Sequence, residues 1–275
     1  MRTRAVARLR NILSVLRNDA TVASRYPIAI TPSSRSGLGH RLRTIMNTLN
    51  STRVVDVLEA LHRDAEAADR EHVEAMMAKI AVPGASIEAL VEDLLADERA
   101  DYRAAYRDRA DNFLAISPEY GRFLYAMARA CKASRIVEFG SSMGISTIYL
   151  AAALRDNGGG QLVGSELEDG KVARARANLE AAGLADLVDI RAGDALETLK
   201  DVGGDVDLLL VDGAFSLYLP VLKLIEPRLK SGAVILGENA FEPGYQSYVR
   251  NPANGYVSLA LPDEGRGNEF SVKLS

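Results

Sequence analysis

The sequence of 275 residues contains no tryptophan and a single cysteine, Cys131. One cysteine cannot form a disulfide within the chain or supply a cysteine-based zinc cluster, and its scarcity fits a reducing compartment. No apolar run approaches the roughly 20 residues that a membrane-spanning helix needs. Arg8 and Arg10 interrupt the N-terminal apolar positions before a secretory signal can form. We therefore expect a cytoplasmic protein.

Negative charge is scarce in the N-terminal part of the chain. Residues 1–53 hold ten arginines, no lysine and one acidic residue, so the rest of the chain carries the net negative charge. Val6, Leu9, Leu13 and Leu16 recur at helical spacing in this basic arm. The arm could dock on the acidic body or a partner subunit, on an anionic membrane surface, or on nucleic acid. Docking is favoured, because aromatic residues do not interleave with the arginines.

Three regions follow from the apolar periodicity. The basic arm and a glycine-serine loop cover 1–53, a helical cap or dimerisation region covers 54–112, and an α/β domain covers 113–275. We expect helices at 52–80, from Ser86 to about Arg109, and from Ser117 to about Cys131, where Ser117-Pro118-Glu119 is an N-cap signal.

Beyond residue 134, predicted strands alternate with predicted helices. Strands are expected at 135–139, 161–166, 187–191, 206–211, 233–238, 257–261 and 269–274, and helices near 144–154, 169–183, 194–200 and 217–229. The expected fold class is α/β: a doubly wound, Rossmann-like, seven-stranded and mostly parallel sheet with an antiparallel C-terminal hairpin, plus an N-terminal helical extension.

Polar residues follow the first three strands. Glu138, Gly140, Gly144 and Ser146 form an acid-glycine turn, Glu166 ends the second strand, and Gly193-Asp194-Ala195 follows the third. A carboxylate at the end of the second strand can bind both hydroxyls of a ribose, and Asp194 can accept from an adenine amino group. Each acid alone is as compatible with capping, but together they indicate an adenosine site.

The motifs for phosphate binding are missing. Neither G-x-G-x-x-G nor G-x-x-x-x-G-K-[ST] occurs, which disfavours dinucleotides and nucleoside triphosphates. S-adenosylmethionine fits better, because its sulfonium and amino acid tail need carboxylate, hydroxyl and main-chain groups.

The fourth and fifth strands also end in oxygen ligands. Asp212 follows one, and Glu238 and Asn239 follow the other. Such a set suits Mg²⁺ and leaves open positions for substrate oxygens. The alternative is that Asp212 and Asn239 cap turns and Glu238 is solvated.

Residues 113–275 resemble the cation-dependent catechol O-methyltransferase-like family of class I S-adenosylmethionine-dependent methyltransferases. The resemblance rests on these features, in chain order: Ser117-Pro118-Glu119-Tyr120-Gly121, the E-x-G-x-x-x-G-x-S turn, Glu166, Gly193-Asp194-Ala195, Asp212 with Tyr218-Leu219-Pro220, Glu238-Asn239, and Gly267-Asn268-Glu269.

The resemblance implies methyl transfer to a hydroxyl oxygen, with Mg²⁺ binding two vicinal oxygens of the acceptor. It implies that Asp212, Glu238 and Asn239 are catalytic and metal-binding. The implied cofactor set adds Ile116, Ala195 and Asp212 to the residues of the turn, Glu166 and Asp194. Glu269 is the implied contact to a substrate hydroxyl.

Departures from the family pattern leave the acceptor open. Glu238 replaces an aspartate, and Phe215 stands where the catechol enzyme has its catalytic lysine. Without that lysine and without tryptophan, a vicinal diol of a sugar or polyol is as compatible as a catechol. His40, in the loop, could supply a base across a dimer interface.

The leading hypothesis is a cytoplasmic, Mg²⁺-assisted O-methyltransferase of small-molecule or glycan hydroxyls, active as a homodimer. A metal-independent enzyme using Asp212 and Glu238 as acid and base, or a degenerate cofactor-binding scaffold, are the alternatives. Nucleic-acid methylation is disfavoured by the acidic body and by the lack of an Asn-Pro-Pro-Tyr motif.

Overall fold

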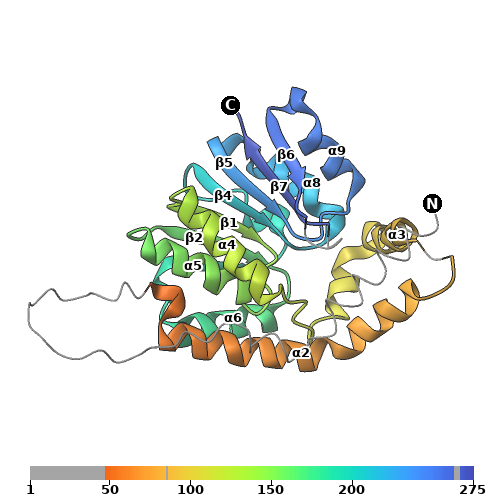
Figure 1. Ribbon diagram of the computed structural model, residues 1–275, viewed down its shortest axis with the longest axis horizontal. Coiled ribbons are helices and arrows are strands. Elements are labelled where there is room, and N and C mark those ends of the chain that lie inside the picture. The colour runs from red at the N-terminus through yellow and green to blue at the C-terminus, as the bar shows by residue number, and fades with distance from the viewer. Residues whose placement is uncertain (1–46, 85, 263–266) are drawn as a thin grey trace, which may run out of the picture. The chain divides into compact units, whose positions relative to one another are not determined.

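Seven strands form one sheet in the computed structural model, which describes residues 47–84, 86–262 and 267–275. The strands are β1 (Arg135–Phe139), β2 (Gln161–Glu166), β3 (Val188–Ala192), β4 (Val206–Val211), β5 (Leu229–Gly237), β6 (Tyr256–Ala260) and β7 (Glu269–Lys273). Their order is β3-β2-β1-β4-β5-β7-β6 (Figure 1). Strands β1 to β5 are parallel, and β7 pairs antiparallel with both β5 and β6. The predicted fold class is confirmed.

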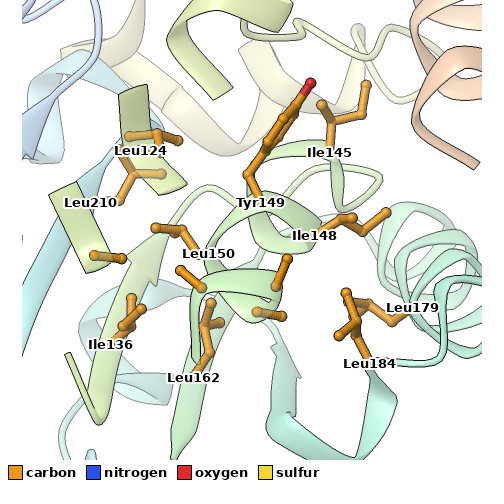
Figure 2. Packing of buried hydrophobic residues seen from close by; sticks show 14 of the residues in the cluster. Leu124, Ile136, Ile145, Ile148, Tyr149, Leu150, Leu162, Leu179, Leu184 and Leu210 are labelled. Carbon is orange, nitrogen blue, oxygen red and sulfur yellow. The ribbon is translucent and has the colours of Figure 1, made fainter. Parts of the chain in front are cut away.

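The central strands are buried on both faces. In β4, Leu208 and Leu210 enter one hydrophobic core, whereas Leu209 and Val211 enter the other. Successive side chains of a strand point to opposite faces, so a run of apolar residues is what a strand with two covered faces requires. Figure 2 shows the first core, where Ile148 and Leu150 of one helix lie in the same cluster as strand residues such as Ile136 and Leu162.

Helices cover both faces of the sheet. The first core includes residues of α4 (Pro118–Ala130), α5 (Ile145–Asp156) and α6 (Asp169–Ala182), and the second those of α7 (Ala195–Thr198), α8 (Tyr218–Ile225) and α9 (Pro243–Arg250). Helix α4 begins as predicted: the hydroxyl of Ser117 accepts from the backbone N–H of Tyr120, and Pro118 occupies the first turn. Strand order reverses between β1 and β4, which is where ligands bind in sheets of this type.

Two helices precede this domain, α2 (Thr52–Ile80) and α3 (Ile87–Arg107). Val54, Leu58 and Leu61 of α2 are buried in the first core, so the helix packs on the α/β domain as a part of it. Helix α3 begins after Ser86, whose hydroxyl accepts from the N–H of Ala89 at 3.0 Å. Both predicted N-terminal helices are therefore present.

Two elements differ from the prediction. Helix α9 was not expected, although Glu242 caps it and Pro243 stands in its first turn. Strand β5 begins at Leu229, earlier than residue 233, because exposed Lys230, Ser231 and Gly232 hide its first part from an apolar pattern. The basic arm up to residue 46, including His40, lies outside the described residues. In the part described, no helix is long and apolar enough to cross a membrane.

Candidate active site

The turn after β1 is fixed by its glycines and by close contact with β4. Gly140 and Gly144 have φ angles of 92° and 90°, in a region of backbone conformation where a residue with a Cβ atom would be strained. A Cβ atom at Gly140 would lie 1.9 Å from the carbonyl oxygen of Asp212. The N–H of Asp212 in turn donates to the Phe139 carbonyl oxygen at 2.9 Å. Gly140 thus lets the β1 turn and the end of β4 approach at the switch point.

Glu138 lies beneath this turn and is fully buried. Its carboxylate accepts hydrogen bonds from the hydroxyls of Ser141 at 2.7 Å, Ser146 at 2.7 Å and Thr147 at 2.5 Å. Burial raises the pKa of Glu138, against the three hydroxyls that lower it. Glu138 and Ser146, both predicted to bind cofactor, are bonded to each other and tie the turn to the start of α5. Thr147 was not predicted.

Glu166 ends β2 beside the same turn. Its carboxylate accepts from the backbone N–H of Ser142 at 2.8 Å and of Glu168 at 2.9 Å. These bonds use one lone pair of each oxygen, so two acceptor positions remain for the hydroxyls of a ribose. Ile116, another predicted cofactor residue, is buried in the loop before α4. Its neighbour in that loop, Phe113, accepts a hydrogen bond from the Ser142 hydroxyl through its carbonyl oxygen, at 2.7 Å.

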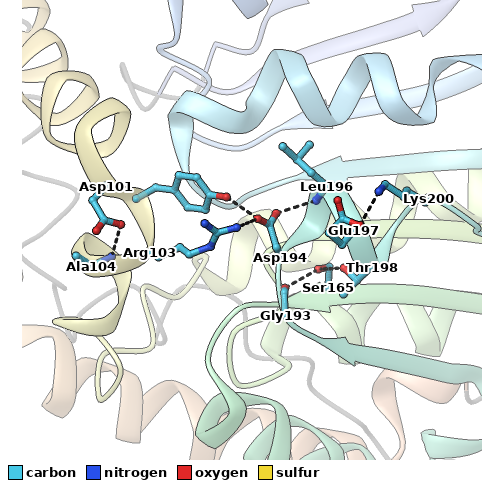
Figure 3. Close-up of polar contacts among 11 residues, drawn as sticks. Asp101, Arg103, Ala104, Ser165, Gly193, Asp194, Leu196, Glu197, Thr198 and Lys200 are labelled. Carbon is cyan, nitrogen blue, oxygen red and sulfur yellow. Dashed lines mark hydrogen bonds and ion pairs between the residues drawn. The ribbon is translucent and has the colours of Figure 1, made fainter.

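Asp194, after β3, meets two side chains from α3. Figure 3 shows its carboxylate between Arg103 on one side and the backbone N–H of Leu196 on the other. The hydroxyl of Tyr102 also donates to Asp194 Oδ2, at 2.6 Å. Burial alone would raise the pKa of Asp194, but the bonds from Tyr102, Leu196 and Arg103 together lower it. The carboxylate is thus held ionised at the start of α7, next to buried Ala195.

Asp212 and Glu238 directly follow the neighbouring strands β4 and β5. Burial raises the pKa of Asp212 well above its ordinary value, and the charges of Glu238 and Glu138 raise it further. The backbone of Glu238 is anchored, since its N–H donates to Val211 and its carbonyl oxygen accepts from Tyr218 at 2.6 Å. Two acidic groups therefore repel each other at the edge of the sheet where the turn and Glu166 lie.

Asn239 follows with a left-handed backbone, at a φ of 46°. Its side-chain amide contacts the carboxylate of Glu238, and its backbone N–H donates to the side-chain oxygen of Asn268 at 2.7 Å. Within the described residues, no group of three or more His, Cys, Asp or Glu side chains could hold a metal ion. The predicted trio accordingly offers two carboxylates and one amide.

Helix α3 also contacts the loop after Asp212. Buried Glu98 accepts from the N–H of Ser216 at 2.7 Å, and the Tyr106 hydroxyl lies 3.2 Å from both Glu98 Oε1 and the Gly213 carbonyl oxygen. Burial raises the pKa of Glu98. Phe215, in this loop, packs edge-on against Tyr218, with the two ring centroids 5.6 Å apart. None of the α3 residues was predicted, because an acid or tyrosine in an amphipathic helix carries no signal of what it contacts.

Glu269, predicted to contact substrate, is fully buried at the start of β7. Arg250 of α9 donates to both of its oxygens, at 2.9 and 2.5 Å, and the Ser258 hydroxyl donates at 2.6 Å. Most of the acceptor capacity of Glu269 is therefore used within the protein.

The fold and this edge of the sheet define a class of protein, the Rossmann-like methyltransferases. A family model described as a methyltransferase domain matches residues 137–240. The O-methyltransferase TomG from Streptomyces achromogenes, solved in complex with SAM, superposes with a TM-score of 0.53 and 26% identity, covering 66% of this chain and 90% of TomG.

Curated relatives narrow the class to a family. A catechol O-methyltransferase from Niastella koreensis is 31% identical over 50% of this chain and 68% of its own length. One from Mycobacterium tuberculosis is 34% identical over 48% of this chain and 59% of its own length. The chain belongs to the catechol O-methyltransferase-like family of class I S-adenosylmethionine-dependent methyltransferases, and it is an S-adenosylmethionine-dependent O-methyltransferase.

Proposed function

We propose that the chain methylates a hydroxyl of a small molecule or glycan that carries vicinal oxygens, with Mg²⁺ at Asp212, Glu238 and Asn239. The observation that carries the proposal is the pair of repelling carboxylates, Asp212 and Glu238, at adjacent strand ends. They share the edge of the sheet with Glu166 and Asp194, the proposed ribose and adenine contacts. Cofactor and acceptor would then meet above the β1 turn.

The residues present fit a divalent cation. Partial burial and the charge of Glu238 raise the pKa of Asp212, and a bound cation would supply the opposite charge that relieves this repulsion. Carboxylate and amide oxygens are ligands that Mg²⁺ prefers. When bound, Mg²⁺ would lower the pKa of the acceptor hydroxyl, and S-adenosylmethionine would supply an electrophilic methyl group.

The protein itself contributes placement. Tyr218 and Val211 hold the backbone of Glu238, and Asn268 holds that of Asn239, so the acidic edge is rigid. Glu166 and Asp194 orient the nucleoside from the ends of two other strands. Holding acceptor and donor in line converts a bimolecular reaction into an effectively unimolecular one.

Phe215 bears on the acceptor. An apolar ring cannot take a proton as a lysine can, so no base of the catechol type stands at this position. We propose that vicinal diols of sugars or polyols are acceptors alongside catechol-like compounds. The N-terminal region, whose Glu98 and Tyr106 contact the loop holding Phe215, would cover the acceptor.

A second candidate is a metal-independent O-methyltransferase. The raised pKa of Asp212 favours it, since a carboxyl whose pKa is raised holds a proton more readily and can exchange it with an acceptor hydroxyl.

Matched acceptors test the proposal. The full chain would be incubated with methyl-labelled S-adenosylmethionine, Mg²⁺, and pairs of compounds that differ only in one of two neighbouring hydroxyls, from both the catechol and the sugar series. We expect methylation of the diols and at least about tenfold slower methylation of their mono-hydroxy partners, because each partner loses one contact to a charged group or to the metal. Equal rates within every pair would contradict two-oxygen binding.

A further inference from the structure

Helix α3 is interrupted immediately before the residues that reach Asp194. Asp101 has non-helical angles, with φ −161° and ψ 85°. Its side chain accepts from the N–H of Ala104 at 3.0 Å, as an N-cap does, and so restarts the helix (Figure 3). Tyr102 and Arg103 open the restarted segment. The break therefore sets the direction in which these two side chains leave the helix.

Both side chains converge on one oxygen of Asp194. The Tyr102 hydroxyl and the Arg103 guanidinium donate to Oδ2, while the N–H of Leu196 donates to Oδ1. The guanidinium also lies over the Tyr102 ring, 5.1 Å from its centroid, so the two donors support each other.

The Asp194 carboxylate keeps one acceptor position that these three donors do not fill. A carboxylate accepts about four hydrogen bonds, two at each oxygen. Oδ2 has two donors and Oδ1 has one, which leaves a single acceptor position on Oδ1. An adenine 6-amino group can donate to that position, whereas the 6-oxo group of hypoxanthine can only accept and would face the carboxylate unpaired.

We propose that Tyr102 and Arg103 are positioning residues for the cofactor: they fix the Asp194 carboxylate so that its one open position selects a 6-amino purine. This inference rests on the proposed role of Asp194 in the adenosine site. It assigns base selectivity to the N-terminal helical region as well as to the methyltransferase domain.

The Asp194 contacts are more than a means of attaching α3. An ion pair whose arginine side chain is 56% exposed adds little to stability. Helix α3 is also attached elsewhere, through Glu98 and Tyr106 at the 213–216 loop. Loss of Tyr102 or Arg103 should therefore leave the helix docked while freeing Asp194 to rotate.

The test compares two ligands that differ at one position of the base. Calorimetry would measure the dissociation constants of S-adenosylhomocysteine and S-inosylhomocysteine for the full-length wild type and for Tyr102→Phe, Arg103→Met and Asp194→Ala. Tyr125→Phe is the matched tyrosine control, because it removes a similar 2.7 Å bond to Asp156 far from the site. Arg99→Met is the matched charge control on the same helix, because Arg99 pairs with exposed Glu92 and, at 3.9 Å, with Glu242, but not with Asp194.

We expect the wild type to prefer the adenine ligand by about 10- to 100-fold, the value of one hydrogen bond to a charged group. Asp194→Ala should abolish the preference. Tyr102→Phe and Arg103→Met should each reduce it at least about threefold, with both controls unchanged. If Tyr102 and Arg103 acted through packing alone, their loss would weaken the binding of both ligands equally and leave the ratio of the two dissociation constants unchanged.

The contrary outcomes are separable. If Asp194→Ala loses the preference but Tyr102→Phe and Arg103→Met retain it, the positioning role is overturned and the adenosine site stands. If Asp194→Ala retains the preference, Asp194 does not read the base and the inference falls with it. If the wild type binds neither ligand, the proposed cofactor site itself is wrong.

Discussion

Gly140 and the carbonyl oxygen of Asp212 approach so closely that a Cβ atom on Gly140 would lie 1.9 Å from that oxygen. The contact joins two parts of the proposed site, the turn that follows β1 and the carboxylate that follows β4. The geometry of either part therefore depends on the other, at the point where strand order reverses.

Gly140→Ala should destabilise the protein by about 3–5 kcal/mol, from backbone strain and overpacking together. Gly144→Ala is the matched control: its φ angle is nearly the same, but its Cβ would meet Ala175 at 3.4 Å, an ordinary contact. It should cost only the strain, about 1–2 kcal/mol. Urea unfolding of both variants checks the difference, and equal losses would show that the approach to Asp212 is relaxed at little cost.

Glu166→Gln should weaken the binding of S-adenosylhomocysteine roughly 10- to 100-fold, because the neutral amide lacks the charged acceptor positions for the ribose hydroxyls. The backbone N–H groups of Ser142 and Glu168 donate to different oxygens of Glu166, and the single oxygen of glutamine can keep only one of these two hydrogen bonds. Calorimetry with Glu168→Gln as the control measures the effect. Unchanged affinity in Glu166→Gln would remove this residue from the cofactor site.

Glu98→Gln should become more stable relative to wild type as pH rises. The folded-state pKa of Glu98 is raised by burial, so folding favours its protonated form. The associated stability is present below the unfolded pKa and is lost as pH rises through the folded pKa. Glutamine stays neutral and avoids this loss. Urea unfolding at pH 4.5 and pH 8 gives the difference, and a gap between variant and wild type that stays constant would contradict the raised pKa.

Arg250→Met should cost about 3 kcal/mol in unfolding free energy, because it leaves the carboxylate of Glu269 buried without its cation. Acceptor KM should stay within about twofold, in keeping with a structural pair. Glu269→Gln separates this from the role that the family resemblance implies. A large rise in acceptor KM in Glu269→Gln, with stability unchanged, would return Glu269 to the substrate site.

The sheet could be predicted because its signals are local. The apolar run 206–211 predicts a strand and the Ser117-Pro118 cap predicts a helix start, each from only a few consecutive residues. The ends of parallel strands share one edge, so Glu166, Asp194 and Asp212 could be grouped from the sequence. Helix α9 was missed, since its short apolar face holds little more than Tyr245 and Val249.

The contacts of α3 could not be predicted. Tyr102 meets Asp194 across 92 residues of sequence, and Glu98 meets Ser216 across 118. Such pairings arise from how the helix packs on the finished sheet, and the break at Asp101 follows no proline or glycine. The sequence likewise could not tell that Arg250 occupies the carboxylate of Glu269.

The most direct test of the account is the metal dependence of methyl transfer in wild type and Asp212→Asn. Turnover of a vicinal diol with labelled S-adenosylmethionine would be measured after chelation and during re-addition of Mg²⁺, with S-adenosylhomocysteine affinity measured in parallel. We predict that chelation abolishes wild-type turnover, that Mg²⁺ restores it, and that Asp212→Asn stays inactive while binding the cofactor product nearly as well. Full turnover of the chelated wild type would contradict the proposed role of Mg²⁺ and favour Asp212 and Glu238 as acid and base.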